Sequence, residues 1–207
     1  MKPVLLHPSY FPSIAHFVAM LHTDAIIFEA HDNYQKQTYR NRTLIFGANG
    51  PLGLNIPIIY SQKNRQRYKD VEIFNSENWQ SQHLKSIESA YSNSPFFEFY
   101  IDDLLYLFEM EFDNLLDLNL NCIAAIYTCL QLEFNYTFSK HYETYIKDKI
   151  DARPLVVAKK GISQNFLRYP QVFEQKHGFI SNLSILDLLF NEGPNAETYL
   201  KNQTLHL

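Results

Sequence analysis

The chain has 207 residues, of which 46% are hydrophobic and 15% aromatic, and its formal net charge is −4. This composition excludes an intrinsically disordered chain, and the length supports one substantial core rather than two full domains. The net negative charge argues against a nucleic-acid-binding protein, and no apolar run approaches the roughly 20 residues of a transmembrane helix. The apolar run before His7 is also too short for a secretory signal, so we expect a cytoplasmic protein.

The first thirty residues predict a βαβ unit. Residues 3–7 and 25–28 are short apolar runs typical of buried strands, and Ser13 is a suitable cap for a helix over 14–22. A strand, a helix and a second strand within this distance indicate two parallel strands.

A β-hairpin is expected next. Residues 42–46 and 52–59 are strand-like, and residues 47–51 contain the glycines and asparagine that adopt positive φ in tight turns. Residues 60–76 are polar and basic, which predicts an exposed loop.

From residue 76 the spacing of apolar residues becomes helical. Trp79, His83, Ile87 and Tyr91 form one stripe, and further helices are expected after Pro95 and over residues 113–132. A short strand is predicted at 135–138, and no structure is assigned to residues 139–168.

The last helix is expected over residues 183–190. Ser181 or Asn182 would cap it, Gly193-Pro194 would end it, and residues 196–201 would add one more turn. We therefore predict a single domain over 1–207 of the α/β (α+β) class. It comprises an N-terminal βαβ unit with a β-hairpin in 1–75 and a mainly helical part in 76–207.

Charge is distributed unevenly along the chain. Residues 36–85 carry eight basic and three acidic side chains, whereas residues 98–148 carry ten acidic and two basic ones. Either an anion-binding region or complementary packing between the two parts would explain this. Cys122 and Cys129 are too far apart on one helix to form a disulfide, so we expect them to be reduced and buried.

Polar side chains follow both strands of the predicted βαβ unit. Parallel sheets bind ligands at the carboxyl ends of their strands, so these residues should share one rim. His7 ends the first strand and is either a general base or a histidine at the edge of the core. The other rim residues are Ser9, Tyr10, Glu29, His31 and Asp32.

Residues 34–42 combine cations, rings and amides. If Arg40 and Arg42 lie in a strand, alternation places both on one face, where two guanidinium groups suit a phosphate or carboxylate. A solvated edge strand is the alternative. Trp79 and His83 belong either to the core or to a cleft. No metal-ligand spacing is present, and the sequence does not tell which cofactor, if any, the protein uses.

Several segments together resemble the WbqC-like protein family. They are residues 7–12 (HPSYFP), 34–42 ending in Arg-Asn-Arg, 55–58 (NIPI), 95–97 (PFF) with Trp79, His83 and Tyr91 before them, and 182–193 (NLSILDLLFNEG). Family members often read His-Gln-Pro where this chain has His7-Pro8. The resemblance implies a cytosolic bacterial protein of surface-polysaccharide (O-antigen) synthesis. Its implied reaction moves a glycine-like acyl or aminoacyl group onto an amino sugar or a nucleotide-linked sugar.

In this hypothesis His7 is the catalytic base, and the substrate is an anionic small molecule, either a nucleotide-sugar or an acyl donor. The substrate-binding residues are Tyr10, Lys36, Tyr39, Arg40, Asn41, Arg42, Trp79 and His83. The cations would hold the anion, the rings would stack on it, and Asn41 would orient it. Two alternatives are a non-catalytic ligand-binding or assembly protein using the same basic pocket, and a structural partner for other proteins.

Overall fold

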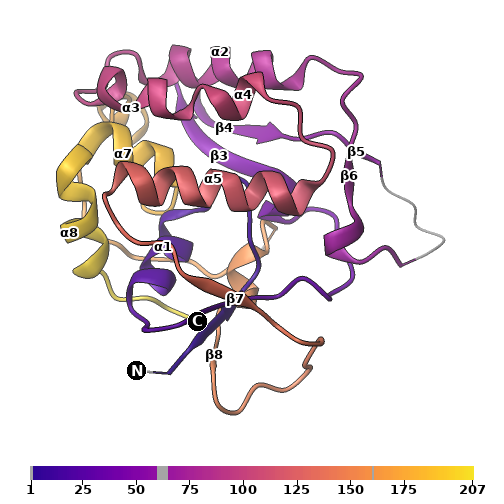
Figure 1. The fold of residues 1–207 in the computed structure, drawn as a ribbon. Helices are drawn as coiled ribbons and strands as arrows, with labels where there is room; N and C mark the ends of the chain where they lie inside the picture. Colours follow the sequence, from indigo (N-terminus) through magenta and orange to yellow (C-terminus); the bar gives the residue numbers. More distant parts are fainter. Residues whose placement is uncertain (1, 60–64, 160) are drawn as a thin grey trace.

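The computed structural model, which describes residues 2–59, 65–159 and 161–207, is a mixed α/β fold with a helical C-terminal part (Figure 1). The site is built on a four-stranded sheet of order β7-β2-β1-β8, in which all neighbouring strands are parallel. Its strands are β1 (Val4–Leu6), β2 (Ile26–Phe28), β7 (Tyr136–Phe138) and β8 (Ile150–Asp151). Helix α1 (Ile14–Leu21) joins β1 to β2, which confirms the predicted βαβ unit.

The order of the strands creates a switch point beside β1. The chain passes from β1 outward to β2 and then β7, and it returns to the opposite side of β1 as β8. Strand β1 is fully buried because it lies between two neighbours, whereas the edge strand β7 is exposed. In sheets of this kind the crevice at the switch point is the usual ligand site.

The hairpin is also confirmed. Strands β3 (Arg42–Gly47) and β4 (Gly50–Asn55) are antiparallel, with Arg42 opposite Asn55 and Gly47 opposite Gly50. Strand β4 begins at Gly50, within residues 47–51, which were expected to form the turn. Gly50 adopts φ 100°, which makes a tight connection between the strands possible.

The expected exposed loop at 60–76 is partly wrong. Residues 60–64 lie outside the described residues, but β6 (Glu72–Ile73) pairs with β5 (Ile58–Ile59), and Tyr68 is fully buried. Tyr68 is held inside because its hydroxyl donates to the carbonyl of Pro8 and accepts from the Asn119 amide.

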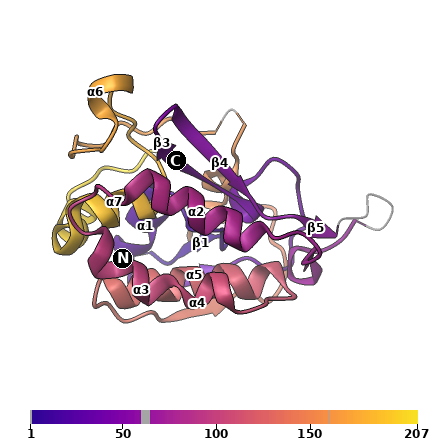
Figure 2. The same cartoon turned by 90° about the horizontal axis from the view of Figure 1, so that it is seen from above.

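The helices follow the predicted stripes. The stripe of Trp79, His83, Ile87 and Tyr91 is buried in α2, which packs on β3 (Figure 2). Two short helices follow Pro95 where one was expected. The helices beyond α1 are α2 (Trp79–Tyr91), α3 (Phe97–Leu104), α4 (Tyr106–Glu109), α5 (Leu115–Cys129), α6 (Glu174–His177), α7 (Ile185–Glu192) and α8 (Ala196–Lys201).

Helix α7 begins at Ile185, two residues later than expected, and its cap is Ser184 rather than Ser181 or Asn182. The Ser184 hydroxyl accepts from the amide of Leu186, whereas the Asn182 side chain accepts from Ala15 and so ties α1 to this region. Gly193 ends the helix at φ 52°, where a Cβ would approach the Phe96 ring to 2.5 Å.

The two cysteines of α5 are buried and free, as predicted. Burial raises the pKa of Cys129 to about 12 and raises that of Cys122 further, which keeps both thiols protonated and unreactive. Among the helices of the described residues, none combines the length and apolar character needed to cross a bilayer.

Asp187 of α7 is a fully buried carboxylate that holds the 169–180 segment. Its Oδ2 accepts from the hydroxyl of Tyr169 and from the amide of Gln171, whose Oε1 in turn accepts from Ile180. Burial raises the pKa of Asp187 to about 6, in spite of these donors. The folded state therefore binds this proton more tightly than the unfolded chain does.

We expect Asp187→Asn to gain stability relative to the wild type as pH rises. The wild type loses stability as pH rises through the raised pKa of about 6, and the shift corresponds to about 3 kcal/mol by pH ~8. Urea unfolding of both proteins between pH ~4 and ~8 measures this. Asp102→Asn on the exposed face of α3 is the control, and a difference that does not change with pH would contradict the prediction.

Candidate functional site

A cavity of about 210 Å³ lies at the carboxyl end of the parallel sheet, on the switch-point side of β1. His7 follows β1 directly, and Asp151 and Arg153 come from the end of β8 and the turn after it. Asp32 and Arg40 reach the cavity from the segment between β2 and β3. Of the predicted rim residues, His7 and Asp32 line this cavity, whereas Ser9, Tyr10, Glu29 and His31 are not among the described residues that line it. Ionisable groups of both signs therefore surround one cavity.

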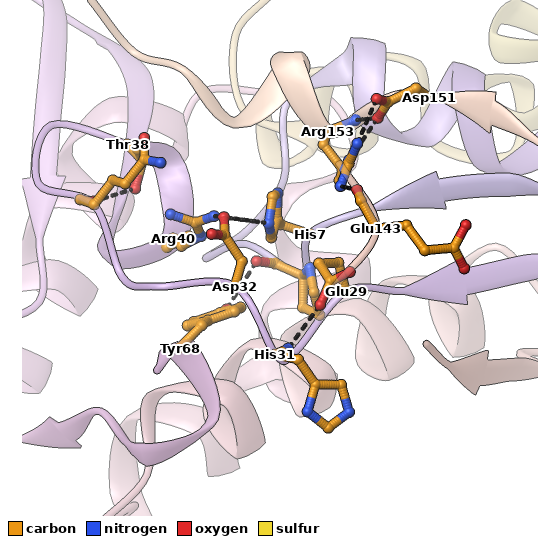
Figure 3. Close-up of polar contacts among 12 residues, drawn as sticks. His7, Glu29, His31, Asp32, Thr38, Arg40, Tyr68, Glu143, Asp151 and Arg153 are labelled. Carbon is orange, nitrogen blue, oxygen red and sulfur yellow. Dashed lines mark hydrogen bonds and ion pairs between the residues drawn. The ribbon is translucent and has the colours of Figure 1, made fainter. Parts of the chain in front are cut away.

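His7, Asp32 and Arg40 form a compact triangle of contacts (Figure 3). Arg40 Nη2 lies 2.7 Å from His7 Nε2 and 2.7 Å from Asp32 Oδ2, and the two acceptors are 3.1 Å apart. Only 1% of Arg40 is exposed. Its guanidinium lies over the Tyr68 ring at 5.2 Å, and its carbonyl accepts from the amide of Asn119.

His7 Nε2 has two contacts that favour opposite tautomers, because the Asp32 carboxylate 3.1 Å away would accept from an Nε2–H, and we assign the tautomer from the shorter contact, that with Arg40. A guanidinium nitrogen only donates, so the 2.7 Å contact makes His7 Nε2 the acceptor. The other hydrogen of Arg40 Nη2 is then donated to Asp32. The proton of the neutral imidazole therefore lies on Nδ1.

The same surroundings set the charge state of the site. Burial, followed by the nearby Arg40 guanidinium, lowers the pKa of His7 to about 4, so the imidazole is neutral near pH 7. Burial acts to raise the pKa of Asp32, but its contacts with His7 and Arg40 outweigh this and lower it. Asp32 and Arg40 are therefore an ion pair beside a neutral imidazole.

A second ion pair lines the other side of the cavity. The Nε and Nη2 of Arg153 each donate to Asp151 at 2.7 Å, and Nη1 donates to the carbonyl of Glu143 at 2.6 Å. Although burial opposes it, Arg153 lowers the pKa of Asp151. Two arginines and two aspartates thus line the cavity. This differs from the basic pocket expected from sequence, because each guanidinium already faces a carboxylate.

Several buried polar atoms of the site have no hydrogen-bond partner within the described part of the chain. They are Arg40 Nε, Arg40 Nη1, His7 Nδ1, Ser9 Oγ and Glu29 Oε2. Buried donors and acceptors of folded proteins are normally paired with protein, water or ligand. Of these atoms, the three of His7 and Arg40 belong to residues that line the cavity.

The 34–42 cluster is divided by the fold. Arg40 lines the cavity with His7, but it lies in a 3₁₀ helix, Tyr39–Asn41, so the expectation that Arg40 and Arg42 share a strand is wrong. Arg42 begins β3 and is not among the described residues that line this cavity. Lys36 is exposed, and Asn41 bonds to Tyr34 and to the carbonyl of Ile56. Tyr39 lines an adjacent cavity of about 240 Å³, which shares Val157 with the first.

Tyr10, Trp79 and His83 form a buried cluster away from the cavity. The hydroxyl of Tyr10 lies 3.0 Å from His83 Nδ1, and the Trp79 and His83 rings are 5.2 Å apart. None of the three lines the His7 cavity in the described structure. Trp79 and His83 therefore belong to the core, which was one of their two open interpretations, and Tyr10 is buried with them.

Arg153 and Asp151 are site residues that sequence reasoning missed. They lie in the 139–168 stretch to which no structure was assigned, and β8 contributes only Ile150–Asp151 to the sheet. The signal available in the sequence was an apolar residue followed by Asp-Ala-Arg-Pro, which is too short to identify a strand.

Fold and site together define an α/β protein with a charged, formally balanced cavity at the switch point of a short parallel sheet. A family model described as "WbqC-like protein family" matches residues 7–157 and 152–199. The chain therefore belongs to the WbqC-like protein family.

One curated relative has a matching length. It is "Uncharacterized protein Rv1507c" of Mycobacterium tuberculosis (strain ATCC 25618 / H37Rv), which is 24% identical over 229 residues and covers 97% of each chain. No solved structure matches the chain. Within residues 2–59, 65–159 and 161–207, no group of three or more His, Cys, Asp or Glu side chains is arranged to hold a metal ion.

Proposed function

We propose that the chain is a cytosolic bacterial transferase that moves a glycine-like acyl or aminoacyl group onto an amino sugar or a nucleotide-linked sugar for surface polysaccharide. The observation that carries the proposal is the meeting of the His7 imidazole with the Arg40–Asp32 ion pair at one cavity. The sugar and the polysaccharide are suggested by the family resemblance, and the binding and proton-transfer roles are argued from the residues.

The charge arrangement suits a small ligand that carries both signs. Arg40 Nε and Nη1 are donors without a partner among the described residues, and they can bind a carboxylate or phosphate oxygen. Asp32 and Asp151 line the same cavity and can accept from an ammonium group. A free amino acid presents an ammonium and a carboxylate within a few bonds, and an aminoacyl phosphate presents an ammonium and a phosphate, which favours such ligands over a purely anionic one.

The transfer itself requires one proton to move. The acceptor amine or hydroxyl attacks the carbonyl carbon of an activated ester, thioester or acyl phosphate, and its proton passes to His7 Nε2. The leaving group departs with the bonding electron pair and receives that proton. His7 Nε2 is available for this only when Arg40 turns toward the anion of the ligand, because in the free protein Arg40 occupies that nitrogen.

The contact between Arg40 and His7 Nε2 also favours a second function. With Nε2 engaged and the pKa of the imidazole lowered to about 4, His7 is a weak base in the free protein. This arrangement fits a non-catalytic protein that binds a small zwitterion through Arg40 and Asp32. Turnover distinguishes the two functions, whereas binding does not.

The test compares glycine, acetate and glycinamide as probes by isothermal titration calorimetry. Each of the latter two lacks one charge of glycine, so the proposal expects glycine to bind at least about tenfold more tightly, a difference of about 1.4 kcal/mol. Glycyl thioester and a panel of nucleotide-linked amino sugars are then assayed for product. Glycine binding without product supports the binding protein, and equal binding of the three probes contradicts both functions.

A further inference from the structure

The cavity beside His7 has a charged interior and an uncharged entrance. The interior contains His7, Arg40 and Arg153, each of which is at most 9% exposed. The exposed residues that line the same cavity, which we call its mouth, are Gln35, Tyr142, Pro154 and Val157. A ligand that fits both parts has charged groups at its inner end and an uncharged part at the mouth.

Tyr142 supplies the aromatic ring of the mouth. It lies in the segment between β7 and β8, and 47% of it is exposed although it lines the cavity. The Arg153 guanidinium lies over the ring, with its central carbon 5.2 Å from the ring centroid. Within the described residues, Arg153 is the only ring or hydrogen-bonding partner of this side chain. The rest of the ring is therefore accessible to a ligand.

Arg153 holds the ring rather than an anion. All three nitrogens of its guanidinium are engaged, because Nε and Nη2 donate to Asp151 and Nη1 donates to the carbonyl of Glu143. Arg40 differs, since its Nε and Nη1 have no partner among the described residues. These in-plane bonds fix the orientation of Arg153 and leave its faces for stacking, and one face supports Tyr142.

A fixed, half-exposed ring beside an amide and two apolar side chains suits a pyranose. The C–H bonds of the sugar form an apolar face that can pack on Tyr142, Pro154 and Val157, and its hydroxyls can bond to the amide of Gln35. The adjacent cavity of about 240 Å³, which shares Val157, is lined only by uncharged side chains in the described part of the chain. It extends the uncharged surface beyond the mouth.

The chemistry of transfer selects the sugar over a nucleobase. In a nucleotide-linked sugar, the ribose and the phosphates separate the base from the reacting group, whereas the sugar itself bears the attacking amine or hydroxyl. That group must reach the acyl carbon bound in the interior, so the sugar is the part that has to lie at the mouth.

We propose that the mouth binds the pyranose ring of the acceptor amino sugar and that Tyr142 is the specificity-determining residue on which this ring stacks. The interior then holds the acyl or aminoacyl group, and the attacking atom of the sugar points inward. The identity of the sugar as the acceptor rests on the proposed function, but its binding at the mouth does not.

The test is saturation-transfer nuclear magnetic resonance with methyl N-acetylglucosaminide. This probe carries no charge, so the ion pairs of the interior do not dominate its binding. In the wild type we expect the strongest transfer to the C–H protons of one face of the pyranose. Titration then gives the dissociation constant, and Tyr142→Ala should raise it at least about fivefold.

Three comparisons isolate the ring. Tyr142→Phe keeps the stacking surface and should bind the glycoside within about twofold of the wild type. Tyr145→Ala is the matched control, because Tyr145 is 87% exposed on the same segment and is not among the described residues that line the cavity. Its affinity should equal that of the wild type. Glycine binding should be unchanged in Tyr142→Ala, which shows that the interior of the cavity is intact.

Three results would overturn the proposal. They are the absence of saturation transfer to the pyranose protons in the wild type, equal affinities of the wild type and Tyr142→Ala, and an equal loss in Tyr142→Phe and Tyr142→Ala. Uridine is the competing probe: a larger loss for uridine than for the glycoside in Tyr142→Ala would assign the ring to a nucleobase and so contradict the sugar site.

Kinetics separate this proposal from the proposed function. If transfer occurs, Tyr142→Ala should raise KM for the acceptor sugar by about the factor seen in binding, with a smaller change in kcat and in KM for the donor. Sugar binding that depends on Tyr142 without any turnover contradicts the transferase and leaves the sugar site intact. Turnover with an unchanged acceptor KM in Tyr142→Ala contradicts the sugar site and leaves the transferase intact.

Discussion

Replacing Arg40 with methionine is expected to remove ligand binding and to destabilise the chain by about 3–5 kcal/mol, the range for breaking a buried ion pair from one side. Methionine fills much of the space of the arginine stem, so the loss reflects the charge. Asp32, only partly exposed, would lose its 2.7 Å partner, and Tyr68 would lose the guanidinium above its ring. Urea unfolding measures the stability, and calorimetry with glycine measures the binding.

The same variant should change the titration of His7. Arg40 is, after burial, the largest influence that lowers the pKa of the imidazole to about 4, while Asp32 acts to raise it. Without Arg40 the pKa of His7 should therefore rise toward its ordinary value, and Nε2 should become a donor to Asp32. Titration of the His7 ring signals reports this shift.

Two further variants control for charge and for position. Arg40→Lys keeps one positive charge but lacks the planar fork, so it should retain more stability than Arg40→Met while still binding glycine weakly. Arg42→Met removes an arginine two residues away that begins β3. Its effect on glycine binding should be within a factor of about two, because Arg42 is not among the described residues that line the cavity. An equal loss of binding in Arg40→Met and Arg42→Met would contradict the assignment of the cavity.

The parts of the fold that sequence predicted are those that local patterns determine. The βαβ unit, the hairpin and the stripe of α2 each follow from spacing within about 30 residues, and each is confirmed. Strand β8 could not be found in this way. It has two residues, and it joins the sheet only because Leu5 pairs with Asp151 across more than 140 positions of sequence.

The candidate site shows the same limit. His7 was predicted to be at the site because the ends of parallel strands share a rim, and Arg40 because it belongs to a cluster of cations. Both residues line the cavity. Neither reason predicts which arginines form ion pairs with aspartates. Asp151 and Arg153 were missed with β8, and the pairing of Arg40 with Asp32 was not foreseen, so the cavity carries two ion pairs where a basic pocket was expected. Trp79 and His83 have the spacing of a buried stripe, and contacts distant in sequence were needed to place them in the core.

His7→Gln is expected to lower turnover by about 10²- to 10⁴-fold, the usual contribution of a general base. Glutamine retains an oxygen that can accept from Arg40, so the ion pair with Asp32 is kept and the free energy of unfolding should change by about 1 kcal/mol or less. His16→Gln is the matched control, because His16 is also a buried imidazole with a lowered pKa but does not line the cavity. It should retain the turnover of the wild type.

The pH dependence of the wild type sharpens this prediction. A base is active when deprotonated, so kcat/KM, which reports the free protein, should remain constant on acidification until the pH approaches the lowered pKa of His7, about 4. The limb of kcat should lie at higher pH, because a bound anion offsets the Arg40 charge that helps to lower the pKa in the free protein. Coincident limbs near pH ~6.5 would mean that His7 is not the base, since a solvent-exposed histidine titrates there. A kcat limb shifted upward from the kcat/KM limb would instead show that the ligand and the imidazole compete for the same guanidinium.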